Sequence, residues 1–276
     1  MEETETLKYL VIAPPRSGST WFCNMLEVNG ILREEKEQYE SLHFQAALTN
    51  EDYKQSFNQI IKKVFKESEC SYRGSKIQAF KLLSSQLRNL SRNILEAGGE
   101  TELNFKKMLS SLCDEKTKII LLDRRKTEEM ASSWVNAIST QQWIFKDGDK
   151  DLHTLNNIIV FHKFYTMFHK YIYKDHMQVK SLVTKNKTFL HLYYEDIQKD
   201  PRTAIKSVFE FLELKEPTMI KLDSVYRKQR TKTSELMLQR YKRFRPKILL
   251  DFLVEFFESK FGTHFKPTAA IRERFD

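Results

Sequence analysis

Four short apolar runs, separated by longer stretches with helical character, restrict the fold of this chain more than any other feature. The runs are residues 9–13, 76–83, 118–123 and 188–194. Their hydrophobicity is continuous rather than alternating, most clearly in the first and third, which is typical of strands buried on both faces of a parallel sheet. Strands that alternate with helices predict an α/β fold, a three-layer sandwich with a central parallel sheet.

The order of these elements also predicts where a ligand binds. In open α/β sheets, ligands lie at the carboxyl ends of the strands. The loops that follow residues 13, 83, 123 and 194 are therefore the places to look for chemistry.

Four helical segments are predicted. Residues 127–145 carry Met130, Trp134, Ala137 and Ile138 at helical spacing, and residues 151–183 continue as an aromatic-rich helical stretch. Asp200 and Pro201 form a cap and first turn, and the helix after them has one apolar face of Ile205, Val208, Phe209 and Leu212. A last helix is predicted to begin at Pro246.

Composition places the chain among globular proteins. Its 276 residues are 41% hydrophobic and contain no repeat or low-complexity tract, so we expect one domain over residues 1–276. Cys23, Cys70 and Cys113 lack metal-site spacing and are expected to be reduced, mostly buried thiols. The polar N-terminus and short apolar runs predict a cytoplasmic protein without a signal peptide or membrane insertion.

The charge balance leaves two interpretations open. Lysine and arginine together number 46 against 37 acidic residues, a formal net charge of +9. This surplus fits an anionic partner or substrate, and it equally fits a solvated lysine-rich surface.

The first apolar run leads into a loop suited to an anion. Pro14 and Pro15 precede "RSGST", and a helical pattern follows. The N–H groups at the start of a helix bind anions. Compared with the ATP-type phosphate loop, Ser19 stands where the phosphate-binding lysine belongs, so triphosphate chemistry is disfavoured. Arg16 and the hydroxyls of the loop can still hold one phosphate-like group, and the alternative is a plain turn without a ligand.

The stretch "YLVIAPPRSGSTWF" closely resembles the phosphosulfate-binding loop of sulfotransferases that use 3′-phosphoadenosine 5′-phosphosulfate (PAPS). The "RSGST" form is typical of the bacterial group similar to trehalose sulfotransferase. The resemblance implies a P-loop NTPase-like sulfotransferase fold and a cofactor site without a metal. Its first cofactor-binding residues are Arg16, Ser17, Gly18, Ser19, Thr20 and Trp21.

Three further segments resemble this family in the same order. Arg124, followed eight residues later by Ser132 and then by Trp134, resembles the second cofactor signature, which binds the 3′-phosphate. Lys81, in "AFKLLSSQ", resembles a lysine near the active site, with a catalytic role. The segment 225–241 is similar to the C-terminal arginine and glutamine segment, which gives Arg227, Gln229 and Arg230 as cofactor-binding candidates. Solvated surface charges are the alternative for each of these segments.

The resemblance also suggests the general base, the group that takes the acceptor's proton. Gly30, Glu34, Glu37 and Tyr39 fit a pattern in which Glu37 aligns with the catalytic glutamate of the trehalose-type group. Glu35 and Gln38 depart from that pattern. The rival bases Glu34, Glu35, Glu40 and His43 therefore stay open, as does a solvated acidic segment.

The resemblance implies transfer of a sulfuryl group to a hydroxyl or nitrogen of a small-molecule acceptor, with adenosine 3′,5′-bisphosphate (PAP) as the product. In length and motifs the chain also resembles saxitoxin-type N-sulfotransferases of natural-product biosynthesis, which suggests a guanidinium alkaloid. A carbohydrate or glycolipid hydroxyl is the alternative acceptor. A P-loop kinase and a nucleic-acid-binding module are the rival functions, and neither has its own motifs here, so no nucleic-acid partner is expected. A homodimer is compatible with the long charged helices.

Overall fold

The computed structural model describes residues 6–33, 65–86, 109, 113–140, 158–186, 188–222 and 235–244. Within these residues lies a five-stranded sheet in the order β2-β3-β1-β4-β5. The strands are β1 (Leu7–Ala13), β2 (Glu69–Tyr72), β3 (Ser75–Leu83), β4 (Lys118–Asp123) and β5 (Phe189–Tyr193). The four predicted strands are confirmed to within two residues at each end.

The sheet is mixed rather than purely parallel. β3, β1, β4 and β5 run parallel, as predicted, with Leu10 opposite Phe80 and Ile119. The unpredicted β2 pairs antiparallel with β3 at the sheet edge, where Tyr72 lies opposite Ser75. The tight turn between them uses positive φ angles at Arg73 and Gly74.

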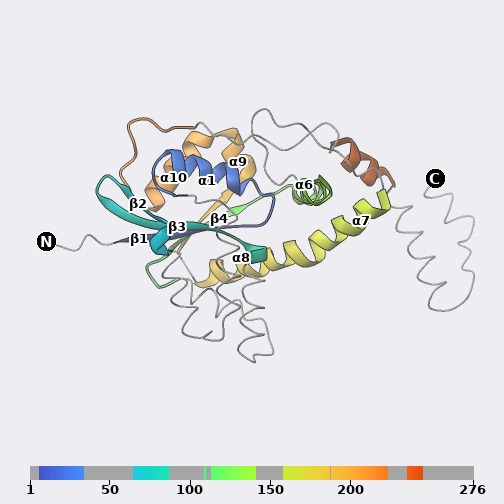
Figure 1. Cartoon of the computed structure of the whole chain (residues 1–276), viewed down its shortest axis with the longest axis horizontal. Coiled ribbons are helices and arrows are strands. Elements are labelled where there is room, and N and C mark those ends of the chain that lie inside the picture. Colours follow the sequence, from blue (N-terminus) through green and yellow to red (C-terminus); the bar gives the residue numbers. More distant parts are fainter. Residues whose placement is uncertain are drawn as a thin grey trace, which may run out of the picture.

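Helices cover both faces of the sheet, which confirms the three-layer α/β architecture (Figure 1). One face carries α1 (Ser19–Val28), α9 (Tyr194–Lys199) and α10 (Pro201–Phe211), and the opposite face carries α8 (Lys174–Asn186). Successive side chains of β1 point to opposite faces of the sheet, so β1 contributes to the hydrophobic core on each face. Tyr9, Val11 and Ala13 pack with α1 and α10, whereas Leu10 and Ile12 pack with Val179 and Val183 of α8.

The remaining helices form a third core beside the sheet. They are α6 (Thr127–Thr140), α7 (Ile158–Met167), the π-helix η1 (Phe168–Tyr173) and residues 235–244. The predicted helical stretch 151–183 thus corresponds to α7, η1 and α8, which together run from 158 to 186. In α6 the predicted residues Met130, Trp134 and Ala137 are buried, and Ile138 packs against this core.

The start of α10 follows the predicted cap. The Asp200 carboxylate accepts a hydrogen bond from the Thr203 N–H at 3.1 Å, and Pro201 begins the helix. The predicted apolar face of Ile205, Val208, Phe209 and Leu212 is buried. The helix predicted from Pro246 lies outside the described residues.

Two smaller expectations also concern the described chain. The three cysteines are free thiols, with Cys23 and Cys113 buried and Cys70 half-buried. No helix in the described segments is both long enough and apolar enough to cross a membrane.

Candidate active site

The loop between β1 and α1 is shaped by two residues in the left-handed region. Arg16 has a φ of 68° and Gly18 a φ of 86°. Gly18 precedes α1 and offers no side-chain cap to it. The N–H groups of the first turn have no acceptors within the helix, and the helix dipole adds partial positive charge there. The loop therefore presents the N–H groups and the partial positive charge that favour an anion.

Ser17 lies between Arg16 and Gly18 in this loop. Its side chain is fully buried, and its Oγ has no hydrogen-bond partner among the described residues. A buried polar atom without a partner costs free energy, so such atoms mark places where a ligand or water is expected.

Gly18 packs directly against the ring of Tyr194, the first residue of α9. A Cβ at position 18 would lie only 2.4 Å from two ring carbons. The Tyr194 ring also meets Trp21 edge-on, with 5.9 Å between ring centroids. The glycine in "RSGST" thus allows the loop to approach an aromatic side chain that follows β5.

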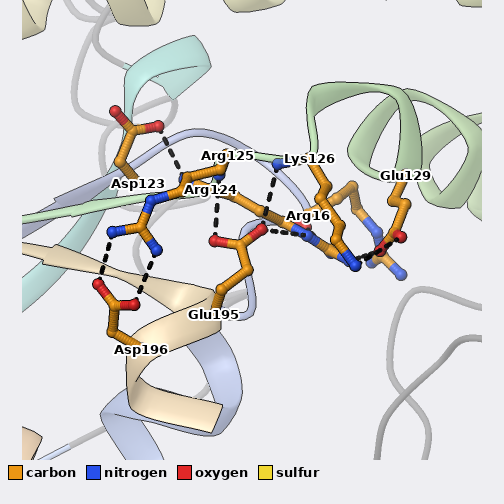
Figure 2. A network of polar contacts seen from close by, with 8 residues as sticks. All are labelled: Arg16, Asp123, Arg124, Arg125, Lys126, Glu129, Glu195 and Asp196. Carbon is orange, nitrogen blue, oxygen red and sulfur yellow. Dashed lines mark hydrogen bonds and ion pairs between the residues drawn. The ribbon is translucent and has the colours of Figure 1, made fainter. Parts of the chain in front are cut away.

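Arg124, which directly follows β4, joins the second predicted motif to the loop (Figure 2). Its Nη1 donates to the carbonyl oxygen of Arg16 at 3.1 Å, and its Nη2 donates to the Glu129 carboxylate at 2.6 Å. Its guanidinium also lies over the ring of Tyr194, 4.7 Å from the centroid. Its buried Nε has no hydrogen-bond partner in the described chain and lies 4.0 Å from the Glu195 carboxylate.

Two acidic residues of α9 hold the turn that follows Arg124. The carboxylate of Glu195 accepts hydrogen bonds from the N–H groups of Arg125 and Lys126, both at 3.1 Å (Figure 2). The guanidinium of Arg125 forms two hydrogen bonds to Asp196, at 2.6 and 2.7 Å, and these hold the pKa of Asp196 below its usual value. The turn after β4 is therefore held by side chains of the helix that directly follows β5.

The first turns of α6 face the same loop. The Nε of Arg16 donates to Ser133 Oγ at 3.1 Å. Ser132 is buried, and its Oγ has no partner among the described residues. Ser133, which was not predicted as a site residue, thus contacts the loop next to the predicted Ser132. Its only sequence signal was its position next to Ser132 in the motif.

Lys81 lies in β3 opposite Val11, two residues before the strand ends. Its side chain is buried and belongs to the sheet face that α1 covers, because residues two apart in a strand share a face and Ile77 and Ala79 belong to that core. Directly after β3, the Oγ of Ser84 is buried without a partner in the described chain. Sequence reasoning missed Ser84, although it begins one of the loops at which a ligand was expected.

On the opposite face of the sheet, Asp123 is the centre of a polar cluster that was not predicted. Its carboxylate pairs with Lys180, and the Nε2 atoms of His176 and His191 each lie 3.6 Å from one of its oxygens. It also accepts a hydrogen bond from the Arg124 N–H at 2.8 Å.

The charge state of this cluster follows from its burial. Burial alone would raise the pKa of Asp123, but His176, Lys180 and the Arg124 N–H hold it well below its usual range. Burial, assisted by the positive charge of Lys180, lowers the pKa of His191. At neutral pH the cluster therefore contains an ionised carboxylate and a neutral His191.

A groove of about 590 Å³ opens beside the Arg124 network, between the first turn of α6 and residues 235–244. Charged side chains of both signs line it, among them Lys126, Glu128, Glu129 and Lys242. Lys242 forms an ion pair with Glu128 across the groove. The groove gives the Glu129 carboxylate a route to solvent.

Several predicted residues lie outside the described part of the chain. These are the proposed base Glu37, its rivals Glu34, Glu35, Glu40 and His43, and the cofactor candidates Arg227, Gln229 and Arg230. Among the described residues, no group of three or more histidine, cysteine or acidic side chains is arranged to hold a metal ion.

Comparison with known proteins agrees with this geometry. The family model described as the sulfotransferase domain matches residues 7–248, which include the loop, Arg124 and α6. A search of curated proteins found no match. Because the family model covers far more than half of the chain, the chain belongs to the sulfotransferase family.

Proposed function

We propose that the chain transfers a sulfuryl group from PAPS to a hydroxyl or nitrogen of a small-molecule acceptor. The observation that carries this proposal is the hydrogen bond from Arg124 to the carbonyl of Arg16, 108 residues away in sequence. It joins the two segments that resemble the cofactor motifs of PAPS-dependent sulfotransferases. The family match supports sulfuryl transfer in general, and the donor, acceptor and base are the specific parts of the proposal.

The phosphosulfate end of the donor is assigned to the β1–α1 loop. The proposed hydrogen-bond donors are Arg16, the N–H groups at the start of α1, and the hydroxyls of Ser17, Ser19 and Thr20. Such donors stabilise the charge that develops on the leaving oxygens, which is the main task of a protein in this kind of transfer. The buried Ser17 Oγ, which lacks a partner in the described chain, fits a ligand that brings acceptor oxygens.

The 3′-phosphate is assigned to Arg124 and Ser132. Both side chains are buried, and in the described chain neither Arg124 Nε nor Ser132 Oγ has a hydrogen-bond partner, although Arg124 Nε lies 4.0 Å from a Glu195 carboxylate oxygen. A phosphate supplies acceptors for both atoms. Trp21 is proposed to contact the same nucleotide, and Arg227, Gln229 and Arg230 are proposed to complete the site.

The proposed reaction is a single in-line displacement. The acceptor's oxygen or nitrogen forms a bond to sulfur while the bond from sulfur to the donor's bridging oxygen breaks. The electron pair stays on that oxygen, and PAP leaves. Glu37 is the proposed base that takes the acceptor's proton, and Lys81 is proposed to stabilise the transferred group. Turnover by Glu37→Gln at the parent rate, with unchanged PAP affinity, would show that another residue is the base.

For the acceptor we propose a guanidinium alkaloid of the saxitoxin type, with transfer to nitrogen. The support is the resemblance in length and motifs to saxitoxin-type N-sulfotransferases. A carbohydrate hydroxyl, as in the trehalose-type group, is the alternative acceptor.

Two measurements test the proposal. Sulfur-labelled PAPS, offered with a panel of alcohols, carbohydrates and guanidinium alkaloids, should give labelled product with one acceptor class. Thermal stabilisation of the protein should be larger with PAP than with ATP and Mg²⁺, because a bound ligand stabilises the folded state. Stronger stabilisation by ATP and Mg²⁺ would contradict the donor assignment and favour a kinase.

A further inference from the structure

The guanidinium of Arg124 already binds a carboxylate. Its Nη2 donates to Glu129 Oε2 at 2.6 Å, and the two side chains are only 10% and 15% exposed. A hydrogen bond between two charged groups in such a sheltered place is strong. Any second anion that binds Arg124 must therefore share the guanidinium with Glu129 or displace it.

The position of Glu129 makes displacement the expected result. Glu129 and Ser132 are three residues apart in α6 and so lie on the same side of the helix. An arginine binds a phosphate best through two neighbouring N–H groups. In Arg124, Nη1 is held by the carbonyl of Arg16 and Nη2 by Glu129. The buried Nε makes no hydrogen bond in the described chain and lies 4.0 Å from Glu195 Oε1, so the shorter contact that a phosphate must replace is the one to Glu129.

Glu129 also has another cation within reach. Lys126 Nζ lies 3.5 Å from Glu129 Oε1, on the opposite oxygen from the one that binds Arg124. Both residues line the groove of about 590 Å³ beside α6. The carboxylate can thus leave Arg124, keep its contact with Lys126 and move into the groove without losing every partner.

We propose that Glu129 sets the donor-nucleotide specificity of this site. Its carboxylate competes with the 3′-phosphate for Arg124 and so lowers the preference for 3′-phosphorylated over unphosphorylated adenosine nucleotides. This inference rests on the proposed function, because it needs the 3′-phosphate at Arg124. It also makes Glu129 a group that assists release of PAP, since the carboxylate returns to the guanidinium as the phosphate leaves.

The test compares two nucleotides and two neighbouring glutamates. PAP and adenosine 5′-monophosphate differ in the 3′-phosphate, and calorimetry gives the ratio of their dissociation constants. Glu129→Gln should tighten PAP binding about tenfold, equivalent to losing one competing charged contact, and should leave the monophosphate unchanged. Glu128→Gln is the matched control. It changes the net charge equally, but Glu128 is 43% exposed and pairs with Lys242 instead of Arg124.

Each outcome has one meaning. A tenfold rise in the preference for PAP in Glu129→Gln, and none in Glu128→Gln, supports the proposal. Equal tightening of both nucleotides, or weaker PAP binding, overturns it. Glu129→Ala must shift the ratio in the same direction as Glu129→Gln, which protects the test against a folding defect in one variant. Failure of the parent protein to bind PAP overturns the proposed function itself, whereas PAP binding with an unchanged ratio overturns only the role of Glu129.

Discussion

A methyl group at position 18 would lie 2.4 Å from two ring carbons of Tyr194, so the β1–α1 loop and the first residue of α9 touch with no space for a side chain between them. The other neighbours of this ring are Trp21, edge-on, and the guanidinium of Arg124. The contact therefore fixes the distance between the proposed phosphosulfate loop and the residues proposed for the rest of the nucleotide.

Gly18→Ala tests this contact. The alanine would have to adopt a left-handed backbone conformation, which is unfavourable for a residue with a Cβ, and its methyl group would clash with Tyr194. We therefore expect a loss of roughly 2–5 kcal/mol in the free energy of unfolding. PAP affinity should fall with it. Gly74→Ala is the control, because Gly74 has a similar φ of 87° but no atom within 4 Å of its Cβ position. It should show only the backbone cost, about 1–2 kcal/mol. Equal losses in the two variants would argue against the Tyr194 contact.

Arg124 and Arg125 are neighbours with different partners, which allows a second test. Arg124→Lys keeps the charge but loses the planar donor pair, so PAP binding should weaken by about 1.5–3 kcal/mol. Arg125→Lys should leave PAP affinity nearly unchanged, because Arg125 is half-exposed and bound to Asp196. Calorimetric titration with PAP measures both. A larger effect at Arg125 would reassign the 3′-phosphate to that residue.

The Asp123 cluster predicts how stability depends on pH. The pKa of Asp123 is lowered in the folded protein, so its contribution to stability is complete above the ordinary carboxyl value of 3.8 and is lost as the pH falls below it. The lowered pKa of His191 acts in the same direction, beginning as the pH falls below 6.5. Denaturant unfolding between pH 7 and pH 3 should therefore show falling stability.

Asp123→Asn should cost about 3 kcal/mol at pH 7, because it leaves Lys180 without its buried counter-charge. The dependence of stability on pH below 3.8 should then become weaker. Glu213→Gln is the control, since Glu213 pairs with Lys118 at an exposed site and should change stability little. An unchanged acid dependence in Asp123→Asn would mean that other groups cause it.

The sequence predicted β1 and β4 most clearly, because both are buried on both faces and so are continuously apolar, whereas β5 is half-buried along its whole length. β2 gave no such signal, since its four residues, Glu69 to Tyr72, are mostly half-exposed at the sheet edge. Its turn also has Arg73 rather than a typical turn residue at the first positive φ. Edge strands of this kind are defined by their neighbour in the sheet rather than by their own composition.

The parts of the site that lie within one motif were also predictable, because a strand, a tight loop and a helix start are local. The partners of Asp123 were not. His176 and Lys180 come from α8, and His191 from β5. The spacing of residues in a sequence predicts which of them share one face of a helix. It does not predict which strand that face packs against. Glu129 was not predicted either, because an acidic residue in the first turn is favourable in any helix and so does not by itself indicate a contact with Arg124.

Ser132 is the residue at which stability and binding should respond in opposite ways. Its buried Oγ has no partner in the described chain, so Ser132→Ala removes an unsatisfied polar group and should leave the melting temperature unchanged or raise it. PAP affinity should fall by about 1.5 kcal/mol, the value of a hydrogen bond to a charged group. Ser139→Ala, in the same helix, is the control, because the Ser139 hydroxyl donates to the Asn136 carbonyl at 3.0 Å. PAP affinity should be unaffected there. A lower melting temperature with unchanged PAP affinity in Ser132→Ala would mean that this hydroxyl serves the fold and not the nucleotide.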